Sequence, residues 1–425
     1  MSAAVETFTP WRARVLRVVY RHFFDIVFFA MSVSQWVVLW WIFPNVVNAL
    51  PLVLSVGAPI PIYVASRHLA TRSQHQAREH LPMSGWMRAY FAVAFTSLFC
   101  GAVLLFVGTL WVSAKFFLSA LAAQAWTARA GLAAESGVDV VCHWLANAGL
   151  ATVGLMFGYG YSIGQQRLKI VRLGLPLRAA PRALHALRIV QISDIHVGQN
   201  LGRAELERFV AQVNALAPDL LCITGDIADA PSADLEGFLP LLAKLQARYG
   251  IFAILGNHDH YAGADHVAAA LRRLTRFTVL RDEQTVIDID GARLHVIGLD
   301  DRGHDWAHGI PHVPYLAATL ATIPNAEPVL LLCHRPDVFP QAAAAGVALT
   351  LAGHTHGGQL ALPRFMGRFR NLAEFITTFD RGLFERDGSY LYVNCGLGVT
   401  AQRLRLNAPR EITLIEVQAA HALAA

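Results

Sequence analysis

Four apolar stretches of about 20 residues each lie in the first part of the chain, and they constrain its fold more than any other feature. They cover residues 23–43, 46–65, 89–113 and 140–161. A helix needs about 20 consecutive apolar residues to cross the hydrocarbon core of a bilayer. One shorter apolar run is commonly the core helix of a soluble domain, but four runs of this length are not. We therefore expect an α-helical multi-pass membrane domain with about four transmembrane helices.

Charged residues divide the chain into two parts of opposite sign. The chain of 425 residues is 55% hydrophobic and only 15% charged, with a formal net charge of +5. The first 183 residues carry 15 Lys and Arg against 5 Asp and Glu, a net charge of +10, and the rest carries 20 against 25, a net charge of −5. This composition excludes a disordered chain, and five cysteines are too few for a disulfide-stapled one. We expect no nucleic-acid partner, since the positive excess belongs to the apolar part.

Basic residues gather at one side of the apolar stretches. Arginines precede the first stretch, separate the second from the third, and follow the fourth, whereas the other connections hold few. The positive-inside rule then places both termini in the cytoplasm. Trp40, Trp41, Trp111 and Trp144 would all lie at the external interface, as an aromatic belt does. We predict a protein of the cell membrane whose remaining part faces the cytoplasm.

The texture of the sequence changes after the apolar part. We expect a membrane domain over residues 1–165, a basic linker over 166–186 and a second domain over 187–425. Short β-rich runs alternate there with amphipathic helices, which predicts an α/β layered domain. The expected helices are 202–216, 233–247 and 264–273. The expected strands are 187–193, 220–224, 251–255, 285–289, 294–298, 329–333, 348–351, 390–394 and 412–417.

Polar clusters follow five of the expected strands. Their oxygen and imidazole donors are Asp194, His196, Asp226, Asn257, His334, His354 and His356. Seven donors are too many for one cation, but they fit two divalent ions that share a carboxylate. In the Asp-x-His and His-x-His pairs, an extended backbone would point both side chains the same way. The set contains no thiolate, which argues against a structural zinc site.

The order Asp-x-His, Gly-Asp, Gly-Asn-His-Asp, His, Gly-His-x-His resembles the motif series of the calcineurin-like metallophosphoesterases. The resemblance covers roughly residues 187–417 and implies a four-layer (αββα) sandwich, with two sheets flanked by helices. The stretches 333–337 and 353–363 look like the membrane-attached branch, which includes bacterial phosphodiesterases and UDP-2,3-diacylglucosamine pyrophosphatases. One departure is Cys395, where that branch usually carries Arg.

The resemblance also implies a role for each donor. One metal would be held by Asp194, His196, Asp226 and His356, and the second by Asp226, Asn257, His334 and His354. Mn²⁺ is the expected ion, and Fe or Zn²⁺ also suit mixed imidazole and oxygen ligands. His258 is predicted to contact the phosphate as a cation and to protonate the leaving oxygen, with Asp259 orienting it.

A phosphoesterase anchored to a bilayer gains most when its substrate lies in the same bilayer. We predict hydrolysis of a phosphodiester or pyrophosphate in a phospholipid or lipid-linked substrate, such as UDP-2,3-diacylglucosamine, at the cytoplasmic face. Residues 362–379 mix apolar and arginine side chains, as an interfacial lid on anionic lipid would, although an ordinary packed loop has the same composition. The alternative is a membrane sensor or scaffold whose phosphoesterase-like domain binds phosphate or a partner without significant turnover.

Overall fold

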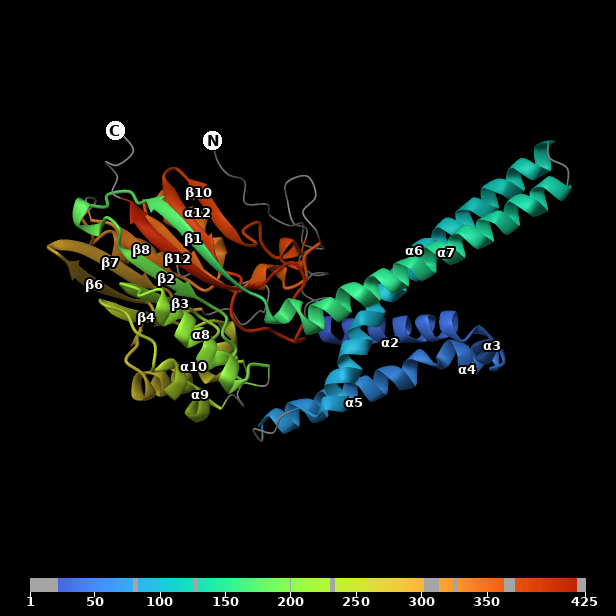
Figure 1. The fold of residues 1–425 in the computed structure, drawn as a ribbon, viewed down its shortest axis with the longest axis horizontal. Coiled ribbons are helices and arrows are strands. Elements are labelled where there is room, and N and C mark those ends of the chain that lie inside the picture. Colours follow the sequence, from blue (N-terminus) through green and yellow to red (C-terminus); the bar gives the residue numbers. More distant parts are fainter. Residues whose placement is uncertain are drawn as a thin grey trace. The chain divides into compact units, whose positions relative to one another are not determined.

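The structure is a computed structural model that divides the chain into two compact units (Figure 1). The first unit comprises Met1–Gln76 and Met83–Phe157, and the second comprises Ala77–Pro82 and Gly158–Ala425. The structure describes residues 22–78, 83–125, 128–198, 200–229, 234–301, 313–324, 327–362 and 371–418.

The first unit is helical. Its helices are α2 (Phe23–Ile42), α3 (Pro44–Asn48), α4 (Leu52–Gly57), α5 (Pro59–Arg78), α6 (Gly85–Ala125) and α7 (Ala128–Ser162), the last of which ends in the second unit. Four segments are long and apolar enough to cross a membrane, namely Phe23–Ile42, Leu52–Ser73, Gly85–Ala120 and Glu135–Gln166. The second segment begins later than predicted, because Pro51 interrupts the chain and a separate short helix, α3, precedes it.

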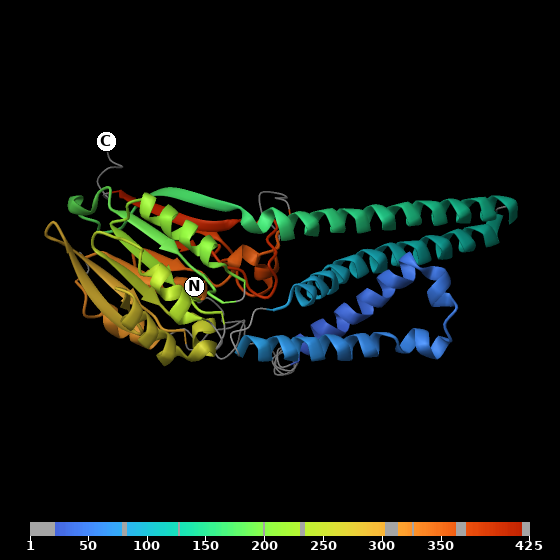
Figure 2. The ribbon, with the colours of Figure 1, turned by 60° about the horizontal axis from the view of Figure 1, so that its bottom comes forward.

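Polar side chains link the helices of the first unit. Arg67 of α5 pairs with Asp25 of α2 at 3.1 Å. The α6–α7 hairpin, whose two helices run side by side in Figure 2, is joined by an ion pair of 2.7 Å between Lys115 and Asp139. The indole N–H of Trp111 donates to the same Asp139 carboxylate at 2.6 Å. These contacts join α2 to α5 and α6 to α7.

The second unit contains two six-stranded sheets. Their strand orders are β1-β12-β2-β3-β4-β5 and β10-β11-β9-β8-β7-β6. Both sheets are mixed, because β12–β2, β6–β7 and β10–β11 are antiparallel pairs among parallel ones. The strands are β1 (Leu168–Pro176), β2 (Arg188–Ile192), β3 (Leu220–Thr224), β4 (Gly250–Ile254), β5 (Thr278–Val279), β6 (Glu283–Ile289), β7 (Ala292–Gly298), β8 (Val329–Leu332), β9 (Leu349–Ala352), β10 (Gly382–Arg386), β11 (Ser389–Val393) and β12 (Arg410–Gln418).

Three apolar layers hold this unit together. Side chains such as Ile189 and Leu349 fill the space between the two sheets. The outer face of the first sheet packs on α8 (Arg203–Ala215), α9 (Leu235–Leu242) and α10 (Asn257–Leu274). The outer face of the second sheet packs on α11 (Val313–Leu320) and α12 (Phe339–Ala344). The order helix, sheet, sheet, helix confirms the predicted α/β sandwich.

The segment predicted as a basic linker, 166–186, is instead part of the first sheet. Strand β1 lies in it and pairs in parallel with the whole of β12. Val171, Leu173 and Leu175 of this strand pack against the core between the sheets. The prediction was wrong because the exposed basic side chains of Lys169 and Arg172 made this stretch resemble a linker and hid the alternation.

Candidate metal centre

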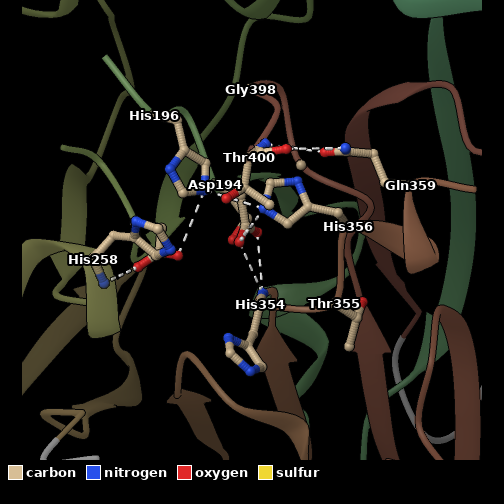
Figure 3. A network of polar contacts seen from close by, with 12 residues as sticks. Asp194, His196, His258, His354, Thr355, His356, Gln359, Gly398 and Thr400 are labelled. Atoms are coloured by element: carbon tan, nitrogen blue, oxygen red, sulfur yellow. Dashed lines mark hydrogen bonds and ion pairs between the residues drawn. The ribbon is translucent and has the colours of Figure 1, made fainter. Parts of the chain in front are cut away.

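All seven predicted donors lie at the carboxyl ends of strands. Strands β2, β3 and β4 of the first sheet and β8 and β9 of the second sheet precede them. Ligands of α/β sheets bind beyond such strand ends. Six of the seven side chains are buried and that of His354 is half-buried. The fold therefore brings donors that lie up to 162 residues apart in the sequence into one cluster, part of which Figure 3 shows.

The backbone of this cluster is left-handed at five donors. The φ angles are 48° at Asp194, 50° at His196, 52° at Asp226, 71° at His354 and 51° at His356. The extended backbone that we predicted for the Asp-x-His and His-x-His pairs is therefore wrong. A residue with a side chain adopts such a φ at a cost of roughly 1–3 kcal/mol, and such residues cluster at functional sites. Five strained donors in one place indicate a site kept for its chemistry.

The first group of donors surrounds His196. Its Nε2 atom lies 3.1 Å from Nε2 of His356 and 3.5 Å from Oδ2 of Asp226. Nε2 of His356 lies 3.5 Å from Oδ1 of Asp194. The backbone N–H of His354 donates to both oxygens of Asp194, at 3.0 and 3.1 Å, and so fixes that carboxylate.

The second group surrounds His334. Its Nε2 atom lies 3.3 Å from Oδ2 of Asp226 and 3.2 Å from Oδ1 of Asn257. Its Nδ1 atom lies 2.8 Å from the carbonyl oxygen of Thr224, to which it can only donate. Neutral His334 thus carries its proton on Nδ1 and turns a free lone pair on Nε2 toward the cluster. Asp226, His334 and His354 together place their ligand atoms within 4.8 Å of one another.

Burial and neighbouring charges together shift the pKa values of these groups. Burial favours the neutral carboxyl of Asp226, but His334 and His258 hold its pKa well below the usual value. Burial lowers the pKa of His356, and the neighbouring His196 lowers it further. Burial and then Arg335 do the same to the pKa of His354. These shifts favour ionised Asp226 and neutral His354 and His356, which are forms that bind metals. Burial also lowers the pKa of His334, but Asp226 raises it to about 10.

The donor set fits divalent cations. Two imidazole Nε2 atoms face each other at 3.1 Å, and each also faces a carboxylate oxygen at 3.5 Å. Lone pairs that converge in this way repel one another unless a cation or protons lie between them. Imidazole together with carboxylate and amide oxygen suits a borderline divalent ion.

His258 lies beside the cluster, but the carboxylate next to it in space is not the predicted one. Asp259 turns away and accepts the backbone N–H groups of Ile227, Ala228 and Gly256 at 3.1, 2.7 and 2.9 Å. Nδ1 of His258 lies 2.8 Å from the carbonyl oxygen of Asp229 and 3.8 Å from its carboxylate. The prediction that Asp259 orients His258 is therefore not supported. Asp259 instead binds the loop before α10, because the Gly-Asn-His-Asp motif forms the first turn of this helix.

Asp229 is a site residue that the sequence interpretation missed. Its carboxylate lies 3.2 Å from Nδ1 of His196. Burial lowers the pKa of His196, but Asp229, together with Asp226 and Asp194, raises it to about 9. A carboxylate behind a ligating imidazole fixes the orientation of the ring. Asp229 could have been predicted from its position three residues after Asp226, because the chain runs from the end of β3 through the site.

Comparisons with known proteins agree with this geometry. The family model for calcineurin-like phosphoesterases matches residues 187–358. The chain is 31% identical to the uncharacterized metallophosphoesterase YkuE of Bacillus subtilis over 274 residues, which are 64% of this chain and 93% of that protein. It is 32% identical to the uncharacterized metallophosphoesterase Cj0846 of Campylobacter jejuni, over 56% of this chain and 61% of that protein. A transmembrane protein with metallophosphoesterase domain from Bos taurus is 30% identical, over 59% of this chain and 57% of that protein.

A two-sheet sandwich with imidazole and carboxylate donors at its strand ends defines a metal-binding α/β enzyme domain. The family-model match and the similarity to the Bacillus protein show that the chain belongs to the calcineurin-like metallophosphoesterase family. It is a metallophosphoesterase, a hydrolase of phosphoester bonds that uses divalent metals. The chain spans less than two thirds of the Campylobacter and bovine relatives, so the similarity to them concerns only part of those proteins.

Proposed function

We propose that the chain is a membrane-anchored phosphoesterase that uses two divalent metal ions to hydrolyse a phosphodiester or pyrophosphate bond. The observation that carries this proposal is the position of Asp226. Its Oδ2 atom lies 3.5 Å from Nε2 of His196 and 3.3 Å from Nε2 of His334. One carboxylate oxygen therefore reaches both groups of donors, as a carboxylate shared by two ions must.

We assign the seven donors to two metals as the family resemblance implies. The proposed ligands of one ion are Asp194, His196, Asp226 and His356, and those of the other are Asp226, Asn257, His334 and His354. When bound, the two ions supply charge that offsets that of the phosphoryl group and lowers the pKa of a water molecule. Mn²⁺ is the ion we propose.

His258 is the group we propose for transferring a proton to the leaving oxygen. Its Nδ1–H donates to the carbonyl oxygen of Asp229 at 2.8 Å, so Nε2 is the atom free to hold and release a proton. The side chain is 26% exposed, which allows contact with a substrate. Its ring lies edge-on to that of His196, with centroids 4.7 Å apart, so the proton is held next to the proposed metals.

We further propose that the apolar helices form a multi-pass membrane domain over residues 1–165, with the catalytic domain in the cytoplasm. Four helices of sufficient length, and relatives named transmembrane proteins, support this. The proposed substrate is lipid-linked, and UDP-2,3-diacylglucosamine is the specific candidate. Residues 363–370 of the predicted lid, 362–379, lie outside the described residues, so the substrate proposal rests on the anchor.

An assay of the full chain in detergent with Mn²⁺ tests this function. UDP-2,3-diacylglucosamine and a soluble aryl phosphodiester would be compared as substrates. We expect the lipid to be cleaved to a monoester with the higher kcat/KM, and Asp226→Asn to abolish both activities. Cleavage of the soluble diester alone would contradict the lipid substrate, and no cleavage of either by metal-loaded protein would contradict hydrolysis of these bonds.

A further inference from the structure

Arg405 is a buried cation in the loop between β11 and β12. Only 1% of it is exposed, and among the described residues no carboxylate forms an ion pair with it. Its guanidinium donates instead to five backbone carbonyl oxygens, those of Cys395 (2.8 Å), Gly396 (3.2 Å), Gly398 (2.6 Å), Ala408 (2.9 Å) and Pro409 (3.3 Å). A buried charge is expensive unless hydrogen bonds compensate it. Both Nη atoms of Arg405 donate, while its buried Nε has no hydrogen-bond partner among the described residues. Arg405 therefore holds both ends of this loop, 396–408, in one conformation.

The same loop is attached to the metal centre. Nη2 of Arg405 lies 3.4 Å from Nδ1 of His356, so the guanidinium closes the cluster behind this imidazole. The backbone N–H of Gly398 donates to the carbonyl oxygen of Asp194 at 2.6 Å. Gln359, three residues after His356, accepts the N–H of Thr400 at 3.0 Å and donates to its carbonyl at 3.1 Å, as Figure 3 shows. Loop 396–408 thus contacts two of the proposed ligand segments.

The other side of the loop packs on the end of α7. The backbone N–H of Arg405 donates to the carbonyl oxygen of Gly160 at 3.3 Å. The hydroxyl of Tyr161 donates to the side chain of Gln402 at 3.2 Å. A Cβ atom at Gly164 would lie 2.1 Å from the carbonyl oxygen of Arg405, and one at Gly160 would lie 2.3 Å from Cδ1 of Leu404. The contact has no room for a methyl group at Gly164, where the obstacle is backbone.

We propose that loop 396–408 couples the end of α7 to the metal centre, with Arg405 as the positioning residue that holds this loop against the backbone of Asp194 and the side chain of Gln359. This inference rests on the proposed role of His356 as a metal ligand. It goes further by giving the last apolar helix a function beyond anchoring. A displacement at the end of α7 moves Arg405 through its backbone and so weakens metal binding. The end of α7 itself lies more than 10 residues away in the chain from any proposed ligand.

Three alanine substitutions on one segment test the coupling. Gly158→Ala meets nothing within 4 Å and is the matched control, Gly160→Ala meets the flexible end of Leu404, and Gly164→Ala meets the backbone of Arg405. The dissociation constant of Mn²⁺ would be measured by calorimetry on the full chain in detergent after treatment with a chelator. We expect Gly158→Ala to bind as wild type, and Gly164→Ala to bind about 10-fold or more weakly, as for residues that support a metal ligand.

Arg405→Met and Arg405→Lys provide a second measurement. We expect Arg405→Met to weaken Mn²⁺ binding about 10-fold or more, and Arg405→Lys to recover part of the loss because it keeps the charge. A purely structural role would lower the melting temperature of these variants without changing the dissociation constant. Wild-type affinity in Gly164→Ala would overturn the coupling even if the Arg405 variants did not fold. Absence of Mn²⁺ binding by the wild type would instead overturn the proposed metal site itself.

Discussion

Nε2 of His196 lies 3.1 Å from Nε2 of His356, and the two rings are stacked with centroids 5.0 Å apart. Both imidazoles are buried, and they come from different sheets of the sandwich. A single proton could join these two nitrogens, but it would leave the nearby carboxylates of Asp194 and Asp226 without a compensating divalent charge. A metal ion satisfies all four groups together, which is why we place one there.

Replacing His258 should separate catalysis from metal binding. We expect His258→Gln to lower kcat by about 100-fold or more, because the leaving oxygen then lacks its proton donor. The metal content, measured by inductively coupled plasma mass spectrometry, should stay that of the wild type. His260→Gln is the matched control, since His260 is on the same helix but its Nε2 binds Asp300 at 2.9 Å. Equal losses of kcat in the two variants would argue against the assignment.

Asp229 and Asp259 should behave differently when each is changed to asparagine. Asp229→Asn should lower kcat and weaken metal binding, because its carboxylate faces His196 at 3.2 Å. Asp259→Asn should instead destabilise the fold by about 1–3 kcal/mol, because an amide cannot accept all three backbone N–H groups. Steady-state kinetics and thermal unfolding measure the two effects. A normal melting temperature with lost turnover in Asp259→Asn would restore the catalytic role predicted from sequence.

Asp300 should contribute stability that depends on pH. Burial alone would raise its pKa, but His260 and Arg281 hold the pKa below the ordinary value. Its contribution is therefore fully present above pH ~4, near the unfolded pKa, and is lost as the pH falls through the lower folded pKa. We expect Asp300→Asn to melt at a lower temperature than wild type at pH 7, and the gap to narrow below pH ~4. A difference in melting temperature that widens in acid would contradict the predicted direction of this pH dependence.

Reporter fusions test the proposed topology. Alkaline phosphatase, which is active only outside the cytoplasm, should be inactive when fused after residue 418 or after Arg78, and active when fused after Ala49. Green fluorescent protein should give the reverse pattern. These expectations follow from the arginines that flank the apolar helices. Active phosphatase at residue 418 would place the catalytic domain outside the cell.

Local pattern predicted most of the catalytic fold. The nine expected strands are all present, with their ends within two residues of the expected positions, because β-rich runs of four to nine residues are visible along the sequence. Strand β10 (Gly382–Arg386) was missed because most of its side chains are exposed. Helix α10 begins seven residues earlier than predicted, at Asn257, because Gly256 caps it and the metal motif supplies its first turn.

The site was predicted less evenly than the fold. The seven donors stand in short motifs after strands, so their convergence follows from the order of elements alone. The partners behind the donors do not, because they depend on tertiary contacts. Arg405 reaches His356 from 49 residues away in the chain. The role predicted for Asp259 is not supported, because its carboxylate accepts three backbone N–H groups and none from the His258 ring.

Metal analysis of the purified wild type and of Asp226→Asn tests the central claim most directly. Both proteins would be loaded with Mn²⁺, freed of excess metal, and measured by inductively coupled plasma mass spectrometry. We expect two ions per chain in the wild type and fewer than one in Asp226→Asn, since one carboxylate oxygen serves both groups of donors. An active wild type with one ion or none, or a variant that retains two, would contradict it.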